Sequence, residues 1–329
     1  MKEVWGMKKF SYLVAILFGA WLLVSNPFSD HYLTYLKAET ITVSMNEDPL
    51  YMEIVEKAKK YEKEPSDAKI DPVWQAIPGY NGVKVNIEKS YKKMKKEGRF
   101  TEKLLVYEEV YPQVHLSELP PAAIYKGNPE KPMVSFIINV AWGNEYLSDM
   151  LETLKKHHVT ATFFLEGRWV KNHPELAKMI VEAGHEVGNH SFTHPDMRSL
   201  STSRIHNEIK RTNEVIEATT GEKPRWFAPP SGSYKEEVAK VASAYGLGTV
   251  MWSLDTIDWQ KPSPDVLIQR VMGKIHNGAL ILMHPTDSTA KSLDRLITQI
   301  KAQNLEIGTV TKLLSEDRIM NKNGLKEES

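Results

Sequence analysis

A regular alternation of short apolar runs with longer amphipathic segments, beginning at residue 133, most constrains the fold of this chain. The apolar runs are Met133–Ala141, Thr160–Leu165, Glu186–Asn189, Arg225–Phe227, Gly248–Trp252 and Leu280–Met283. The helical patterns are Tyr146–His157, Pro174–Ala183, Ser203–Thr219, Lys235–Tyr245, Pro264–His276 and Thr289–Gln303. Strands that alternate with helices of this length predict an α/β fold with a parallel sheet. Roughly 180 residues suit a (β/α) barrel, incomplete or distorted, with its chemistry on the loops after the strands.

The N-terminal segment has the form of an export signal. Lys8 and Lys9 precede an apolar run over residues 10–24, and a basic start followed by ~7–15 apolar residues is typical of a secretory signal. The run is short for the ~20 residues of a membrane-spanning helix. No clear cleavage site precedes Asp30, so residues 1–29 are either a signal peptide or a signal anchor. We expect an extracytoplasmic protein, secreted or held at the membrane only through this segment.

Two further parts precede the barrel pattern. Residues 39–118 predict a small α+β accessory module, in which residues 83–87 alternate as a strand, residues 87–96 look helical and residues 104–110 form a second strand. Residues 119–132 carry four prolines, at 120, 121, 129 and 132, and predict a linker. Residues 315–329 form a polar tail. The barrel pattern therefore occupies residues 133–314.

Charge and cysteine content exclude some classes of function. Lys plus Arg and Asp plus Glu are balanced at 42 each, which argues against nucleic-acid binding through net positive charge. Seven basic residues nevertheless cluster between Lys89 and Lys103. They form either a solvated helix face or a contact for an anionic wall polymer or membrane surface. The chain has no cysteine, so any metal depends on His, Asp and Glu.

A histidine pair carries the strongest chemical signal. His190 and His194 lie four residues apart after an apolar run. In a helical turn both imidazoles would lie on one face. Histidine is the commonest metal ligand, and this spacing suits a single ion. We therefore expect the two rings to converge on one metal.

Three more segments follow other predicted strands. The loop 228–234 contains Pro230, Gly232 and Tyr234 and could direct backbone N–H groups at an oxyanion. Residues 252–259 place two carboxylates, Asp255 and Asp258, between two indoles, Trp252 and Trp259. His284 ends the last apolar run, where it could act as a general acid. We expect it to hydrogen-bond one of the two carboxylates.

Together these segments resemble the NodB-homology polysaccharide deacetylases, carbohydrate esterase family 4, over residues 133–314. The resemblance rests on residues 161–167 (Ala-Thr-Phe-Phe-Leu-Glu-Gly), the His190/His194 motif, the Pro-Pro-Ser-Gly loop, residues 255–259 and residues 282–284. Residues 139–144 are most similar to a sporulation-associated branch of the family.

The resemblance implies a metal-dependent hydrolysis of N-acetyl groups. A divalent ion, most often zinc, would be held by His190 and His194 and would polarise the acetyl carbonyl. His284 would protonate the leaving amine, with Asp255 or Asp258 orienting it. The substrate would be an N-acetylated glycan such as peptidoglycan. Its binding surface would include Tyr234, Trp252, Trp259 and Pro230.

The first family motif is altered. Where the family reads Thr-Phe-Asp-Asp-Gly, this chain reads Ser-Phe-Ile-Ile-Asn from residue 135. Either Asn139 or Ile137 takes the place of the catalytic base, and neither accepts a proton from water. The metal-binding Asp is also missing, and Ala228 replaces the usual loop Arg. Asn139, Asn144 or Glu145 could supply an oxygen ligand, and Glu145 is the nearest replacement base.

Two hypotheses remain open. The first is a deacetylase acting on a cell-wall or related glycan, weakened by these losses. The alternative is a glycan-binding pseudoenzyme that keeps the cleft and its indoles but has lost turnover.

Overall fold

The computed structural model describes residues 18, 21, 31, 48–321 and 324–325. The predicted signal segment, residues 1–29, falls outside the described residues except for positions 18 and 21. Within the described part of the chain, no helix combines the length and apolarity needed to cross a membrane. The chain divides into two compact units, Met1–Glu62 with Val85–Glu108, and Lys63–Lys84 with Glu109–Ser329.

Unit 1 is a small helical module. Its elements are α3 (Pro49–Ala58), the 3-10 turns η1 (Lys59–Tyr61) and η2 (Glu102–Leu104), and α4 (Ile87–Met94). Asp48 caps α3 by accepting a hydrogen bond from the backbone N–H of Leu50 at 2.9 Å, as expected for an N-cap carboxylate. Its core contains Ile54, Tyr91 and Met94. The predicted helix after residue 87 is confirmed.

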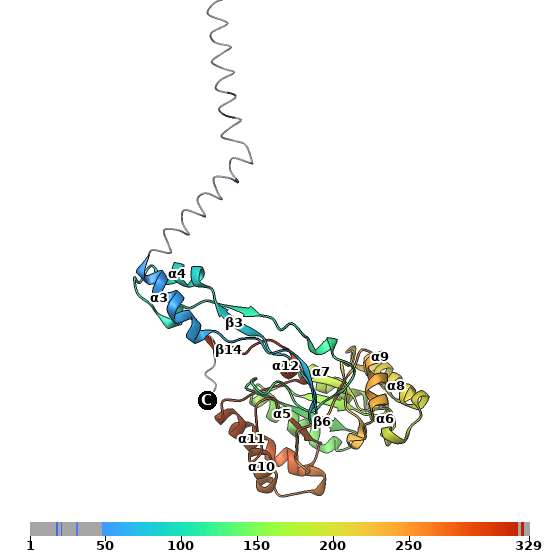
Figure 1. Ribbon diagram of the computed structural model, residues 1–329. Helices are drawn as coiled ribbons and strands as arrows, with labels where there is room; N and C mark the ends of the chain where they lie inside the picture. The colour runs from blue at the N-terminus through green and yellow to red at the C-terminus, as the bar shows by residue number, and fades with distance from the viewer. Residues whose placement is uncertain (1–17, 19–20, 22–30, 32–47, 322–323, 326–329) are drawn as a thin grey trace, which may run out of the picture. The chain divides into compact units, whose positions relative to one another are not determined.

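Unit 2 contains the main sheet (Figure 1). Among the described residues, eleven strands join in the order β1-β2-β5-β10-β9-β8-β7-β6-β12-β11, with β13 also paired to β6. Their bounds are β1 Lys69–Asp71, β2 Gln75–Ile77, β5 Ala123–Ile124, β6 Met133–Val140, β7 Thr162–Leu165, β8 Glu186–Asn189, β9 Trp226–Phe227, β10 Gly248–Val250, β11 Leu254–Asp255, β12 Leu280–Met283 and β13 Glu306–Gly308. From β5 to β11 every pairing is parallel. The predicted incomplete (β/α) barrel is confirmed.

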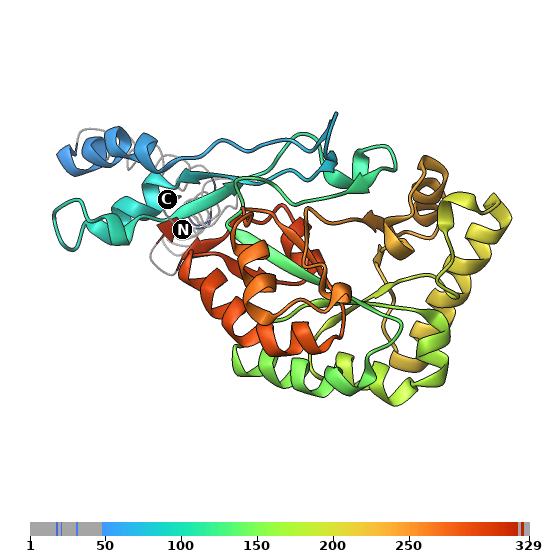
Figure 2. The same ribbon diagram turned by 90° about the horizontal axis from the view of Figure 1, so that it is seen from below.

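Helices follow the parallel strands and lie on the outside of the curved sheet (Figure 2). They are α5 (Asn144–Lys156), α6 (Gly167–Asn172), α7 (Pro174–Glu182), α8 (Thr202–Thr220), α9 (Glu236–Ala244), α10 (Pro264–Met272) and α11 (Asp287–Ala302). The short helix α12 (Val310–Leu314) instead packs with Met133 and Ile137 of β6 on the inner side of the sheet. Short 3-10 turns are η3 (Leu116–Glu118), η4 (Met197–Ser199), η5 (Pro230–Gly232) and η6 (Asp258–Gln260). Small two-stranded sheets pair β3 (Gly82–Val85) with β4 (Tyr107–Val110) and β14 (Met320–Asn321) with β15 (Gly324–Leu325).

The side chains of β6 divide between two cores. All eight residues of this strand are buried, and successive side chains of a strand point to opposite faces. Phe136 and Ile138 pack in the large core that includes residues of α5, α7, α10 and α11. Met133 and Ile137 pack in a smaller core with residues of β5, β7, β10 and β12, inside the curved sheet. This alternation decides which β6 residues can reach the inner face.

Parts of the predicted accessory module and linker belong to the barrel unit. Residues 63–84 and 109–118 group with unit 2. Strand β2 pairs antiparallel with β5, which lies within the predicted linker 119–132. Strand β5 in turn pairs in parallel with β10. The sheet therefore extends to residues on the N-terminal side of residue 133.

Candidate active site

The predicted site residues gather at the C-terminal edge of the parallel strands. Because Met283, the last residue of β12, pairs with Ile138 of β6, the next residues, Asn139 and His284, occupy neighbouring positions there. The register of β7 with β8 brings His190 to the same edge, on the other side of β7 from Asn139. A (β/α) barrel places its chemistry at this edge.

The structure distinguishes between the two candidates for the position of the missing base. Ile137 is fully buried in the inner core. Asn139 lies on the same face of β6, two residues closer to the C-terminal edge, and is 4% exposed. Its Oδ1 has no hydrogen-bond partner among the described residues. Asn139, and not Ile137, therefore faces the site.

The two histidines of the motif are adjacent and neutral. Their ring centroids lie 5.0 Å apart in an edge-to-face arrangement. Nδ1 of His190 lies 2.8 Å from the carbonyl oxygen of Ala228. Since a carbonyl only accepts, Nδ1 carries the proton and Nε2 keeps its lone pair. Burial lowers the pKa of His190 to about 3 and also lowers the pKa of His194.

A loop, and not the helical turn that we expected, brings these rings together. Ser191 and His194 have positive φ angles of 62° and 55°, a conformation that costs free energy in residues other than glycine. The carboxylate of Glu208 on α8 holds the loop by accepting hydrogen bonds from the backbone N–H groups of Phe192 and Thr193, each at 2.8 Å. Asn189 adds a 2.8 Å bond from the N–H of Ser191 to its Oδ1. Sequence reasoning missed Glu208.

His284 bonds to Asp258, which confirms the predicted pairing. The distance from His284 Nδ1 to Asp258 Oδ1 is 2.8 Å, and the His284 N–H donates to Oδ2 at 2.6 Å. Thr289 donates its hydroxyl to the same Oδ2 at 2.6 Å. Asp258 is fully buried, so three donors compensate for the removal of its carboxylate from water. Asp255 instead accepts a 2.7 Å bond from the N–H of Ile257.

An exposed indole covers the His284 imidazole. The rings of Trp142 and His284 are stacked, with centroids 5.8 Å apart and planes inclined by 9°. Trp142 is 47% exposed. Gly143, at φ 82°, permits this placement, since a Cβ there would lie 2.0 Å from the carbonyl oxygen of Pro285. Trp142 was missing from the predicted binding surface.

The remaining predicted binding residues differ in exposure. Trp259 is 56% exposed, next to Asp258, whereas Pro230 is buried. Trp252 is half-buried and lies against Gly232 of the 228–234 loop, where a Cβ would approach the indole to 2.8 Å. Tyr234 is half-buried, and burial raises its pKa.

The donor set for a metal ion is incomplete. No group of three or more His, Cys, Asp or Glu side chains in the described ranges could hold an ion. Asn144, a candidate replacement ligand, already accepts a 2.7 Å hydrogen bond at Oδ1 from the indole of Trp169. Glu145 is exposed at the start of α5. The neutral imidazoles suit zinc, but the Asp that completes the family's ligand set is missing, so these residues do not fit a tightly held catalytic ion.

Comparison with known proteins identifies the family. Residues 126–250 match the family described as polysaccharide deacetylase. Over 199 residues the chain is 33% identical to the peptidoglycan-N-acetylmuramic acid deacetylase PdaA of Bacillus subtilis, covering 59% of this chain and 76% of PdaA. The chain belongs to the polysaccharide deacetylases of carbohydrate esterase family 4.

Other known proteins are more similar to this chain. The uncharacterized protein YlxY of Bacillus subtilis is 57% identical over 311 residues, which cover 94% of this chain and 98% of YlxY. The crystal structure of BA3943 from Bacillus anthracis, described as a CE4 family pseudoenzyme, has 55% identity and a TM-score of 0.80, and the match covers 85% of this chain and 100% of that one. A BA3943 mutant described as having restored enzymatic activity has 56% identity and a TM-score of 0.79, over 82% of this chain and 99% of that one.

Proposed function

We propose that this protein binds an N-acetylated cell-wall glycan at the C-terminal edge of the sheet without hydrolysing it. The observation that carries this proposal is the buried amide of Asn139 at the strand end that faces the site. Deacetylation requires a group that takes a proton from the attacking water. An amide holds a water by hydrogen bonds but does not take its proton.

Two further departures from the family pattern also argue against hydrolysis. The metal-binding carboxylate is missing, and Ala228, whose carbonyl oxygen accepts from His190, stands where the family resemblance leads us to expect Arg. A general base alone is worth about 10²–10⁴ in rate, so losing it together with a metal ligand leaves little turnover. The description of BA3943 as a pseudoenzyme, at 55% identity, supports this reading.

The retained groups suit glycan binding. Trp142 stacks on His284, and Trp259 follows Asp258 in the chain; both present exposed indoles. Aromatic rings pack against apolar faces of ligands, and an imidazole supplies a polar contact beside them. Peptidoglycan is the substrate named for PdaA, and we assign the same class of polymer to this site.

A second candidate function is slow deacetylation. It is favoured by the intact His284–Asp258 hydrogen bond and by the adjacent lone-pair-bearing imidazoles of His190 and His194. On this reading the two imidazoles bind a divalent ion weakly, zinc being the ion best matched to nitrogen donors. The two candidates differ in whether acetate is released.

We further infer an extracytoplasmic location, since the predicted ligand is a wall polymer and the chain begins with a signal-like segment. The similarity of residues 139–144 to a sporulation-associated branch suggests a role during sporulation. The exposed Lys92 and Lys93 of α4 are candidates for contact with an anionic wall polymer, whereas Lys89 is paired with Glu108 at 3.0 Å. Fractionation of cells carrying an epitope-tagged chain tests the location, and recovery of the tag in the cytoplasmic fraction alone would refute it.

Co-sedimentation with purified peptidoglycan tests the binding proposal. The wild type should pellet with N-acetylated peptidoglycan, and His284→Gln combined with Trp142→Ala should reduce the bound fraction. Chemically de-N-acetylated peptidoglycan serves as the matched control and should bind less. Equal binding to both polymers, or none to either, would refute recognition of the N-acetylated glycan.

A further inference from the structure

Asn144 lies between two parts of the candidate active site. It is the first residue of α5, and Gly143, the N-cap of that helix, separates it from Trp142. Trp142 stacks on His284, so the segment that ends at Asn144 carries one part of the site. The Asn144 side chain bonds to a different segment, which begins at α6.

Two hydrogen bonds fix the amide of Asn144. The indole Nε1–H of Trp169 donates to Oδ1 at 2.7 Å, and Nδ2 lies 3.2 Å from Nε2 of His173. Because an indole N–H only donates, turning the amide over would place two donors against each other. Nδ2 therefore donates to Nε2 of His173, and the His173 ring carries its proton on Nδ1.

The two partners of Asn144 are themselves fixed. Trp169 is 3% exposed and packs in the large core. The backbone N–H of His173 donates to the carbonyl oxygen of Trp169 at 2.8 Å, and the centroids of the two rings lie 5.7 Å apart. Asn144 is therefore bonded to a part of the molecule that is held by its own packing and hydrogen bonds.

The start of α6 also holds the loop between His190 and His194. The backbone N–H of Gly167 donates to the carbonyl oxygen of Ser191 at 2.9 Å. The backbone N–H of Arg168 donates to the carbonyl oxygen of the next loop residue at 3.0 Å, and its guanidinium donates to that of the one after at 3.1 Å. Three successive residues of the loop are thereby bonded to α6.

Helix α6 thus connects the two parts of the site. Its first residues fix the histidine loop, and Trp169 fixes Asn144 at the start of α5. A single aromatic stack is a weak interaction, so the stack on His284 does little by itself to hold the exposed indole of Trp142. Binding surfaces keep their geometry when neighbouring hydrogen bonds hold the residues that carry them.

We propose that Asn144 is a positioning residue for glycan binding, whose bonds to Trp169 and His173 hold Trp142 over His284 and fix its place relative to the histidine loop. The inference rests on the proposed glycan-binding function. Since Oδ1 of Asn144 accepts the indole bond, it also gives this side chain a role other than that of a metal ligand.

NMR of the full chain tests the positioning role without a ligand. The indole of Trp142 should give the His284 ring protons a ring-current shift, identified by its loss in Trp142→Ala. Asn144→Leu keeps the approximate size of the side chain but removes both hydrogen bonds, and most of the shift should be lost. Asn172→Leu, at an exposed position of α6, is the matched control and should leave the shift unchanged.

A conservative variant should restore the arrangement. In Asn144→Asp one oxygen still accepts from Trp169, and the other accepts from His173 once that ring carries a proton on Nε2. The ring-current shift should therefore stay close to that of the wild type. A loss as large as in Asn144→Leu would contradict a role for these two hydrogen bonds.

The tautomer of His173 is a test that needs only the wild type. At mildly alkaline pH the nitrogen chemical shifts of the ring should show a protonated Nδ1 and an unprotonated Nε2. An Nε2–H tautomer would show that Asn144 does not donate to this ring, and it would overturn the proposal.

Calorimetry with tetra-N-acetylchitotetraose relates the position of Trp142 to binding. Asn144→Leu should raise Kd roughly fivefold, as expected from the loss of one aromatic contact. If Asn144 acts through Trp142, adding Asn144→Leu to Trp142→Ala should cause no further rise. Additive losses in the double variant would show that Asn144 acts independently of Trp142 and would overturn the proposal.

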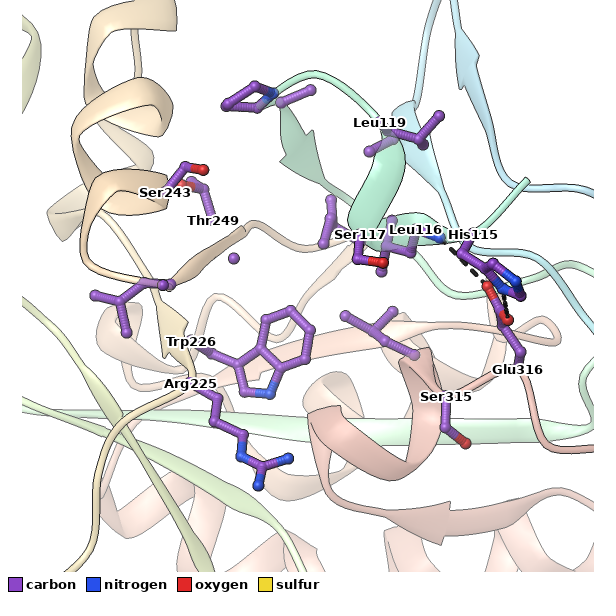
Figure 3. A pocket seen from close by; sticks show the side chains of 18 of the residues that line it. His115, Leu116, Ser117, Leu119, Arg225, Trp226, Ser243, Thr249, Ser315 and Glu316 are labelled. Atoms are coloured by element: carbon purple, nitrogen blue, oxygen red, sulfur yellow. Dashed lines mark hydrogen bonds and ion pairs between the residues drawn. The ribbon is translucent and has the colours of Figure 1, made fainter.

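A cavity at the other end of the strands supplies a second control. It measures about 820 Å³ and lies at the N-terminal ends of β9 and β10, where Trp226 and Thr249 line it (Figure 3). Ser243→Phe narrows this cavity from an exposed position of α9 and should change neither the ring-current shift nor Kd. Weaker binding in Ser243→Phe with unchanged binding in Asn144→Leu would place the probe in the cavity and overturn the proposal.

These measurements separate the positioning role from the proposed function. If the wild type does not bind the probe, glycan binding is refuted, and the ring-current shift still decides whether Asn144 positions Trp142. If the wild type binds but Asn144→Leu keeps the full ring-current shift, the positioning role is refuted and glycan binding stands.

Discussion

Asp258 accepts two hydrogen bonds from His284, one from its ring Nδ1 at 2.8 Å and one from its backbone N–H at 2.6 Å. The carboxylate thereby fixes both the position of the β12 strand end and the orientation of the imidazole. Because Thr289 also donates to it, this fully buried group serves as an acceptor only. This hydrogen-bonded pair lies beside the strand end that carries the amide of Asn139.

Asp258→Asn should destabilise the protein. The amide that replaces the carboxylate directs N–H donors at existing donors, so at least one buried polar group loses its partner, at a cost of about 1–3 kcal/mol. Urea unfolding should show a lower midpoint with an unchanged m-value. Asp255→Asn is the control, since Asp255 accepts a single backbone bond in the described contacts. Equal effects of both substitutions would contradict the assigned role of Asp258.

Gly143→Ala should displace Trp142 from His284 as well as lower stability. A Cβ at this position would lie 2.0 Å from the Pro285 carbonyl oxygen, whereas at Gly184, which has the same φ of 82°, it would meet nothing within 4 Å. Gly184→Ala should therefore show only the conformational cost, about 1 kcal/mol. Thermal unfolding and ligand binding should distinguish the two variants. If Gly143→Ala loses no more stability than Gly184→Ala, residue 143 does not approach Pro285 as closely as described.

We expect His185 to decrease the stability of the folded protein as the pH falls. Burial lowers its pKa to about 4, and its Nδ1 accepts a hydrogen bond from the N–H of Ala161 at 3.2 Å. Between the ordinary pKa of ~6.5 and about 4, the unfolded chain binds a proton that the folded chain does not. The free energy of unfolding therefore falls as pH falls through this window, by at most ~1.4 kcal/mol per pH unit for one proton. In His185→Gln the slope should be shallower, and an unchanged slope would refute the assignment.

Trp142→Ala should weaken glycan binding at the candidate active site. Loss of the exposed indole removes about 1 kcal/mol of aromatic contact, roughly a fivefold rise in Kd. Calorimetry with an N-acetylated oligosaccharide measures the change. Val73→Ala, at a side chain that is 74% exposed, is the control. An unaltered Kd in Trp142→Ala would remove this residue from the binding surface.

Much of the fold could be predicted because long, periodic segments follow the barrel pattern. Each of the six apolar runs contains a strand of the sheet, and each helical pattern overlaps a helix. The strands that were missed are short. β5 has two residues, and its place in the sheet comes from pairing with β10, more than a hundred residues further along the chain. No local pattern encodes such a contact.

The sequence predicted which residues form the candidate site, but not the backbone conformation that positions them. The adjacency of His190 and His194 was expected from a helical turn, yet it results from a loop that Glu208 holds with backbone hydrogen bonds. Glu208 lies on a helix 14 residues after His194, and nothing in its own neighbourhood marks it as a loop anchor. Likewise, the choice between Ile137 and Asn139 required the register of β6 with its neighbours.

Acetate release and glycan binding, measured on the same wild-type protein with zinc or cobalt added, test the central claim most directly. We predict saturable binding of N-acetylated peptidoglycan without acetate above the buffer level, an unchanged result in Glu145→Gln, and a gain of acetate release in Asn139→Asp. Steady acetate release by the wild type that disappears in His284→Gln would show that the protein is an active deacetylase and would contradict the claim.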